Sequence, residues 1–147
     1  MPRSIRTTIR IRTTPHRVLE AFLQHEHLHR WWGVERSLVQ PHNGGVYALT
    51  WGISEAGFRY VSSGIIETYD PGSRLKVANY VYYTADRPLL GPMSLEISVR
   101  AEGSAAVVDI VQNGYGEGPD WEWYREAVKE AWPKALGMLK GYVEKNE

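Results

Sequence analysis

The sequence contains no cysteine, so it can form no disulfide, no thiolate metal site and no thiol nucleophile. It has no excess of charge of either sign, because 17 Lys and Arg residues balance 17 Asp and Glu residues. A neutral chain lacks the broad basic surface that binds nucleic acids or membranes, so we expect neither partner. No apolar run approaches the roughly 18 residues of a membrane-spanning helix, and the first residues lack the hydrophobic stretch of a signal peptide. These absences predict a soluble cytoplasmic protein.

Phenylalanine is scarce among the aromatic residues, with two Phe against six Trp and nine Tyr. A buried indole or phenol needs a hydrogen-bond partner, so Phe or Leu would fill a simple core equally well. The surplus therefore indicates an apolar surface that also meets water or a ligand. The alternative is that most of these rings lie half-buried at the edges of elements. With 147 residues and no repeat or linker, the chain is predicted to form one domain over residues 1–147.

The beginning of the chain predicts a strand followed by two short helices. Ile5, Ile9 and Ile11 alternate with arginines, which is the period of a strand with one wet face. Thr14 is a suitable N-cap before Pro15, so a helix is expected over residues 15–23. A second helix is expected over residues 26–32, ending at Gly33.

The middle of the chain, residues 34–113, shows mostly strand patterns. Alternating apolar residues are separated by glycine-rich turns, which favours neighbouring antiparallel strands. The clearest strands are expected at residues 58–69, 75–83, 93–99 and 105–113, and residues 84–92 are expected to form a loop.

The last part of the chain predicts one long helix from Pro119 to Lys145, with a kink at Pro133. Its apolar residues recur at spacings of three and four: Trp121, Tyr124, Val128, Trp132, Leu136, Leu139 and Val143. One amphipathic helix cannot cover both faces of a large sheet, so the sheet must curl around it. The predicted class is α+β.

Several motifs, in this order, resemble a known family. They are Trp31-Trp32-Gly33, Gly44-Gly45, Gly64-Ile65-Ile66-Glu67, Asp70-Pro71 with Arg74-Leu75, Gln112-Asn113-Gly114-Tyr115, and Trp132 with Leu136, Leu139 and Tyr142. The sequence is similar to the homologues of the activator of the heat-shock-protein-90 ATPase. That family belongs to the START-related superfamily, together with polyketide cyclases and pollen allergens. Each motif alone is weak, and their order gives the resemblance its specificity.

The resemblance implies a helix-grip fold, in which a curved antiparallel sheet of six or seven strands wraps around the C-terminal helix. It also implies a cavity between them that takes an apolar or aromatic small molecule. Two departures bear on the mouth of that cavity. Val34 stands where the family usually has proline, and Ala131 stands before Trp132 where glycine is common.

The candidates for chemistry outside the cavity are few. His25, His27 and His29 could bind zinc, but structural zinc usually has four ligands and no cysteine can complete the set. We interpret them as solvated histidines, apart from adventitious metal binding. Gly114, Gly116 and Gly118 mimic a dinucleotide fingerprint, but they lack its third spacing and the parallel βαβ unit. No hydrolase, zinc-protease or phosphate-loop motif occurs. No catalytic residue, metal or cofactor is therefore predicted.

The inward side chains of the expected sheet and helix give the predicted ligand-binding set. It comprises Tyr47, Leu49, Trp51, Tyr60, Asn79, Gln112, Val128, Trp132 and Leu136. Asn79 and Gln112 are polar amides among apolar neighbours, and each would cost about 1–3 kcal/mol if buried without a partner. Hydroxyls of Tyr47 or Tyr60, trapped water or a ligand could satisfy them.

Three functions remain open. The leading hypothesis is non-enzymatic binding of a small apolar or aromatic molecule in the cavity. The second is a co-chaperone that stimulates the heat-shock-protein-90 ATPase, which rests on the family resemblance alone. The third is a cyclase, dehydratase or hydrolase that uses Glu67, Tyr60 or Gln112. The protein is expected to be a monomer or a homodimer.

Overall fold

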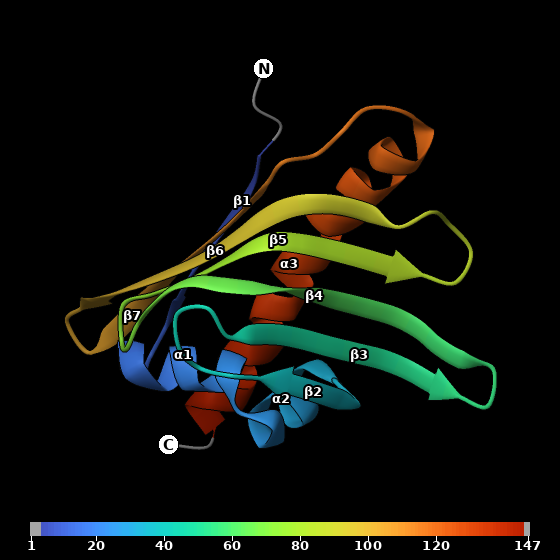
Figure 1. Cartoon of the computed structure of the whole chain (residues 1–147). Coiled ribbons are helices and arrows are strands. Elements are labelled where there is room, and N and C mark those ends of the chain that lie inside the picture. Colours follow the sequence, from blue (N-terminus) through green and yellow to red (C-terminus); the bar gives the residue numbers. More distant parts are fainter. Residues whose placement is uncertain (1–3, 146–147) are drawn as a thin grey trace.

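The computed structural model describes residues 4–145. Figure 1 shows its strands and helices as one sheet with a long helix against it. The elements in chain order are β1 (Ile5–Ile11), α1 (Pro15–Leu23), α2 (His25–Trp32), β2 (Arg36–Val39), β3 (Val46–Ser54), β4 (Gly57–Asp70), β5 (Arg74–Thr84), β6 (Leu90–Glu102), β7 (Ala105–Asn113) and α3 (Pro119–Lys145).

The seven strands form one sheet in the order β1-β7-β6-β5-β4-β3-β2, and each neighbouring pair is antiparallel. The sheet curves around α3, which lies across its concave face (Figure 1). The predicted helix-grip architecture is confirmed. Two details differ from the expected strands: a short strand β2 extends the sheet beyond β3, and β6 begins at Leu90, inside the segment expected to be a loop.

Helix α1 begins and ends where the sequence predicts, and α2 ends at Trp32 as predicted but begins one residue earlier, at His25. The backbone N–H of Arg17 donates to the Thr14 hydroxyl at 3.3 Å, so Thr14 caps α1. Gly33 has a φ of 75° at the end of α2, a left-handed conformation that glycine adopts without strain. This sharp end brings the preceding residue, Trp32, next to α3.

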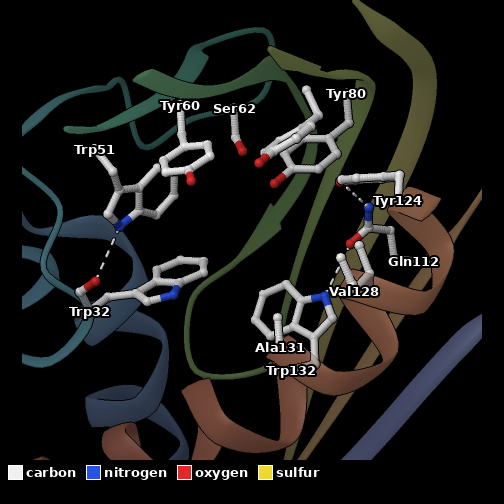
Figure 2. Close-up of a pocket in the computed structure, with 12 residues that line it drawn as sticks. Trp32, Trp51, Tyr60, Ser62, Tyr80, Gln112, Tyr124, Val128, Ala131 and Trp132 are labelled. Carbon is white, nitrogen blue, oxygen red and sulfur yellow. Dashed lines mark hydrogen bonds between the residues drawn. The ribbon is translucent and has the colours of Figure 1, made fainter. Parts of the chain in front are cut away.

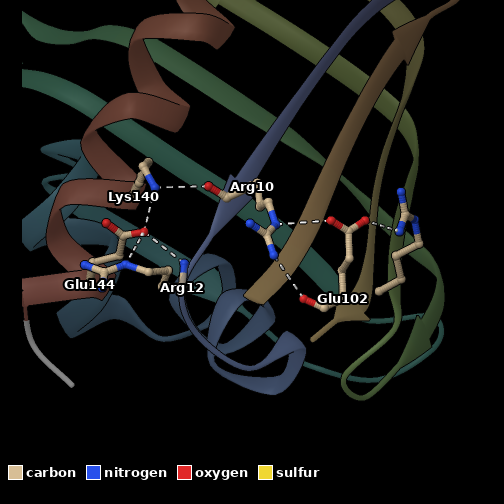
Figure 3. A network of polar contacts seen from close by, with 6 residues as sticks. Arg10, Arg12, Glu102, Lys140 and Glu144 are labelled. Carbon is tan, nitrogen blue, oxygen red and sulfur yellow. Dashed lines mark hydrogen bonds and ion pairs between the residues drawn. The ribbon is translucent and has the colours of Figure 1, made fainter. Parts of the chain in front are cut away.

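The long helix α3 continues through Pro133 and buries one apolar stripe. Its C-terminal end is fixed to β1 by polar contacts (Figure 3). The Glu144 carboxylate accepts from the backbone N–H of Arg12 at 2.9 Å and from Lys140 Nζ at 2.6 Å. Lys140 also donates to the carbonyl of Arg10 at 3.1 Å. No helix within residues 4–145 is long and apolar enough to cross a membrane.

Two irregularities in the ladders of β5 decide which side chains face α3. The pairing of β5 with β6 shifts between Val77 and Tyr80, and the pairing of β4 with β5 shifts between Ser63 and Ile65. Asn79 lies in the first shift with a φ of 50° and is exposed. An extra residue in a strand reverses the faces of the residues after it. Val77 and Tyr80 are therefore both buried, although they differ in parity.

Candidate functional site

A cavity of about 230 Å³ lies between α3 and the concave face of the sheet. Figure 2 shows side chains from α2, α3 and several strands surrounding it. The lining residues are Trp32, Trp51, Tyr60, Ser62, Tyr80, Tyr82, Gln112, Tyr124, Ala127, Val128, Ala131 and Trp132. Seven of these twelve side chains are Trp or Tyr, so the surplus noted in the sequence is concentrated here.

Three indoles form one end of the cavity. The ring of Trp32 stands edge-on to that of Trp51, with centroids 5.3 Å apart, and tilts against that of Trp132 at 5.4 Å. The indole N–H of Trp51 donates to the carbonyl of Trp32 at 3.1 Å. On its other side, Trp32 stacks on Trp31 at 4.8 Å, and the indole of Trp31 is held by the carbonyl of Ala21. These contacts fix the orientation of the indoles within the protein.

Three phenol rings form the facing wall. Tyr82 stacks between Tyr60 and Tyr124, with centroid separations of 6.4 and 4.6 Å. Burial, together with the neighbouring phenols of Tyr60 and Tyr80, raises the pKa of Tyr82 to about 12. Burial also raises the pKa of Tyr124 well above its ordinary value. Both phenols therefore stay protonated at neutral pH.

Gln112 connects strand β7 to two aromatic residues of α3 at the inner end of the cavity. Its side-chain oxygen accepts from the indole N–H of Trp132 at 3.0 Å, and its amide nitrogen donates to the Tyr124 hydroxyl at 2.9 Å. The second amide hydrogen is directed at the sulfur of Met93, 3.6 Å away. Gln112 is buried, and these protein contacts satisfy it. Of the alternatives open for this amide, the structure shows satisfaction by protein groups, although not by Tyr47 or Tyr60.

The hydroxyls of Tyr60, Ser62 and Tyr80 point into the same space from the sheet side (Figure 2). Ser62 and Tyr80 are both buried, whereas Tyr60 is half-buried and accepts a hydrogen bond from Arg59 Nε at 2.9 Å. Burial raises the pKa of Tyr80, although the neighbouring Ser62 hydroxyl acts in the opposite direction. This part of the cavity is polar but neutral.

The mouth of the cavity is bordered by small residues on α3. Ala127 and Ala131 line the cavity and are exposed to solvent. Val128 and Trp132, one position further along the helix, are buried. The opening therefore lies where the helix presents methyl groups in place of larger side chains.

The structure brings five of the nine predicted site residues to the cavity and places four elsewhere. Trp51, Tyr60, Gln112, Val128 and Trp132 line it. Leu49 and Leu136 are fully buried in the core. Tyr47 is also buried, and its hydroxyl donates to the carbonyl of Phe22 at 2.8 Å. Asn79 is exposed, because the shift in β5 turns it away from α3. The placement of these four residues in the site is therefore corrected.

The sequence pattern could have identified some of the lining residues outside the predicted set, but not all of them. Ser62 shares the parity of Tyr60 on one strand, and Tyr124 belongs to the apolar stripe of α3, so both could have been found. Tyr80 and Tyr82 were hidden by the bulge in β5. The alanines carry no chemical signal and matter through their size. The remaining lining residue, Trp32, enters through tertiary packing of α2 on α3.

The other candidates for chemistry lie away from the cavity. The Nδ1 atoms of the three histidines of α2 have separate partners: Ser37 for His25, Tyr142 for His27 and the carbonyl of Val34 for His29. Within residues 4–145, no group of three or more His, Cys, Asp or Glu residues is arranged to hold a metal ion. Glu67 is exposed and pairs with Lys76 at 3.0 Å.

Comparison with known proteins gives one family and many similar folds. The family described as Activator of Hsp90 ATPase homolog 1-like protein matches residues 12–144. No curated protein matches the chain.

Three solved structures illustrate the similarity of fold. Protein CV1439 from Chromobacterium violaceum is 24% identical, with a TM-score of 0.74, over 96% of this chain and 97% of that one. The AHSA1 protein from Silicibacter pomeroyi is 15% identical, with a TM-score of 0.76, over 98% and 99% of the two chains. Aha1 from Colwellia psychrerythraea, whose structure is that of a dimer, is 15% identical, with a TM-score of 0.71, over 96% of each.

Proposed function

This chain belongs to the family of Activator of Hsp90 ATPase homolog 1-like proteins, and we propose that it binds a small apolar or aromatic molecule in the cavity between α3 and the sheet. The observation that carries the proposal is a hollow lined by seven Trp and Tyr side chains in the concave face of the fold. Small-molecule sites are typically concave, mostly apolar and supplied with a few oriented polar groups. This cavity has each of those properties.

The arrangement of the walls supports binding because little reorganisation is needed. The indoles of Trp51 and Trp132 are held by hydrogen bonds, and Gln112 joins Trp132 to Tyr124. Side chains that are ordered in advance lose little rotamer freedom when a guest arrives. A guest would replace water on aromatic faces, which contributes about 25 cal/mol for each Å² of apolar surface removed from water.

The test uses a probe of suitable size and a variant that closes the mouth. Binding of 2-acetylnaphthalene is measured by the rise in Tm and by quenching of tryptophan fluorescence. Ala131→Leu places a larger side chain at the mouth, and we expect it to weaken binding at least tenfold. Glu130→Leu is the matched control, because Glu130 is the neighbouring exposed residue of α3 and does not line the cavity. Equal binding by Ala131→Leu and the unmodified protein would contradict the proposal.

The second candidate function is stimulation of the Hsp90 ATPase, and the observation that favours it is the description of the family. Its test is the rate of ATP hydrolysis by Hsp90 with and without this protein, together with co-purification of the two. Increased hydrolysis supports this function, and the absence of both effects dismisses it. The Ala131→Leu variant separates the two functions, because closing the cavity need not affect a chaperone contact elsewhere.

We do not propose an acid–base reaction in the cavity. Its lining offers phenols as titratable side chains, and burial holds the pKa of Tyr80, Tyr82 and Tyr124 above the ordinary value. A general base works best with a pKa near the operating pH, which these phenols do not approach.

The oligomeric state stays a prediction of monomer or homodimer. Aha1 from Colwellia psychrerythraea is a dimer at 15% identity. Light scattering on this protein distinguishes the two states directly.

A further inference from the structure

The cavity has a polar side and an aromatic side, and their chemistry restricts what fits. We infer that the guest is an uncharged aromatic molecule of one or two rings that carries a hydrogen-bond-accepting oxygen, such as a carbonyl, directed at the hydroxyls of Tyr60, Ser62 and Tyr80. This inference rests on the proposed function and specifies the chemical class of the ligand.

The size of the cavity limits the number of rings. A dry cavity of about 150 Å³ accepts benzene. The volume of about 230 Å³ is half as large again, which suits a substituted single ring or two fused rings. The indoles of Trp32, Trp51 and Trp132 lie 5.3–5.4 Å apart in contacting pairs at one end, so a flat ring finds aromatic faces and edges there.

The lining excludes an ionised guest because it supplies no opposite charge. None of the lining side chains is Lys, Arg, His, Asp or Glu. Arg59 contacts the hydroxyl of Tyr60, but it is exposed and not among the lining residues. A carboxylate or ammonium moved into this space would lose its hydration without gaining a partner, at a cost far above that of a neutral group.

The hydroxyls leave hydrogen-bond donors free inside the cavity. Tyr60 accepts from Arg59, so its own proton is not used in that bond. Ser62 and Tyr80 lie beside each other, and one bond between them uses only one of their two protons. Gln112 offers nothing further, because its oxygen and both amide hydrogens already have protein partners. At least two hydroxyl protons are therefore available to donate hydrogen bonds inside the cavity, and an acceptor oxygen on the ligand would receive them.

The test compares three probes that share the naphthalene ring. They are 2-acetylnaphthalene with a neutral acceptor, 2-ethylnaphthalene without one, and 2-naphthoate with a charge. We expect the ketone to bind about fivefold more tightly than the hydrocarbon, as one net hydrogen bond provides. We expect the carboxylate to bind at least tenfold more weakly than the ketone. Dissociation constants come from quenching of tryptophan fluorescence.

Variants locate the source of the preference. Tyr80→Phe and Ser62→Ala each remove a hydroxyl, and we expect the ratio between ketone and hydrocarbon to fall toward one while the hydrocarbon still binds. Tyr83→Phe is the matched control, because Tyr83 is on the same strand and exposed outside the cavity. Continued hydrocarbon binding also shows that the variants remain folded.

The outcomes separate this inference from the proposed function. If the hydrocarbon binds as tightly as the ketone, or if the carboxylate binds most tightly, the inferred ligand class is wrong and the cavity remains a binding site. If none of the three probes binds, the proposed function fails together with the inference.

Discussion

The indole N–H of Trp132 donates to the side-chain oxygen of Gln112 at 3.0 Å, and this bond joins the long helix to strand β7 at the back of the cavity. Both residues are almost completely buried. The same Gln112 amide donates to Tyr124, about two turns earlier on α3. One glutamine therefore fixes two aromatic rings of the helix against the sheet.

Replacing Gln112 with leucine removes both bonds and leaves the Trp132 N–H and the Tyr124 hydroxyl without a partner in an apolar setting. We expect Gln112→Leu to lower the free energy of unfolding by about 2–4 kcal/mol, because each buried unpaired group costs about 1–3 kcal/mol. Urea denaturation measures the change. Asn113→Ala is the control at the next, exposed position, and about 0.5 kcal/mol or less is expected there. Equal losses of unfolding free energy at both positions would show that the buried hydrogen bonds of Gln112 do not contribute to stability.

The left-handed backbone of Asn79 gives a second prediction. With a φ of 50° at an exposed position, Asn79→Gly is expected to keep or slightly increase the Tm. Asn79→Val is expected to lose about 1–2 kcal/mol, because a β-branched residue is strained in that region.

Binding of 2-acetylnaphthalene tests the same two variants independently of stability. Because Asn79 lies outside the cavity, both folded variants should bind the probe as the unmodified protein does. A selective loss of binding would restore Asn79 to the site.

The half-buried ring of Tyr82 predicts an unusual alkaline titration. Its pKa of about 12 means that the folded protein prefers the neutral phenol, so the contribution to stability is present below the ordinary pKa of 10.0. That contribution is lost as the pH rises through the folded value. The measurement is phenolate absorbance as a function of pH in the unmodified protein and in Tyr82→Phe. The difference between the two curves should show that the Tyr82 phenol titrates near pH 12. If the group removed by Tyr82→Phe titrates near pH 10 instead, the half-buried, stacked position of Tyr82 is contradicted.

Asp109, on the outer face of the sheet, predicts a loss of stability at low pH, whereas Tyr82 predicts a loss at high pH. Burial alone would raise the pKa of Asp109, but hydrogen bonds from Arg6 and Thr8 outweigh it and lower the pKa below its ordinary value of 3.8. A carboxyl with a lowered folded pKa contributes stability above its unfolded pKa and loses it as the pH falls through the folded value. Because Arg6 is largely exposed, the contribution is at most about 1 kcal/mol.

The measurement compares Asp109→Asn with the unmodified protein by urea denaturation at several pH values. The variant should be less stable at pH 7, and the difference should shrink as the pH falls below about 4. Glu117→Gln makes the same change in net charge at an exposed loop position and serves as the control. A difference that is constant between pH 7 and pH 2 would refute the role given to this carboxylate.

The architecture could be predicted from local patterns because each element carries its own boundary signals. Thr14 caps α1, Gly33 ends α2, and the apolar stripe of α3 persists over the whole helix. Alternation along the strands marked which face meets the helix. The turn at residues 70–72 joins β4 and β5 where its proline and glycine predict it.

The site was harder to predict because it depends on exceptions to those patterns. The ladder shift in β5 turned Asn79 outward and Tyr80 inward, and period-two counting does not register such a shift. Parity also cannot separate an inward residue that fills the core from one that borders a hollow. Tyr47 and the cavity residue Trp51 share a parity on β3, but Tyr47 is closed off by its bond to Phe22.

The rim formed by Ala127 and Ala131 has a consequence for timing. A hollow that is closed by a mobile loop releases its content at the pace of the loop. Here the border is a turn of regular helix with methyl side chains, so exchange needs no backbone hinge. Residence time should then depend on how tightly the indoles and phenols contact a bound molecule, whereas the size of the side chain at position 131 should set how easily the molecule passes the border.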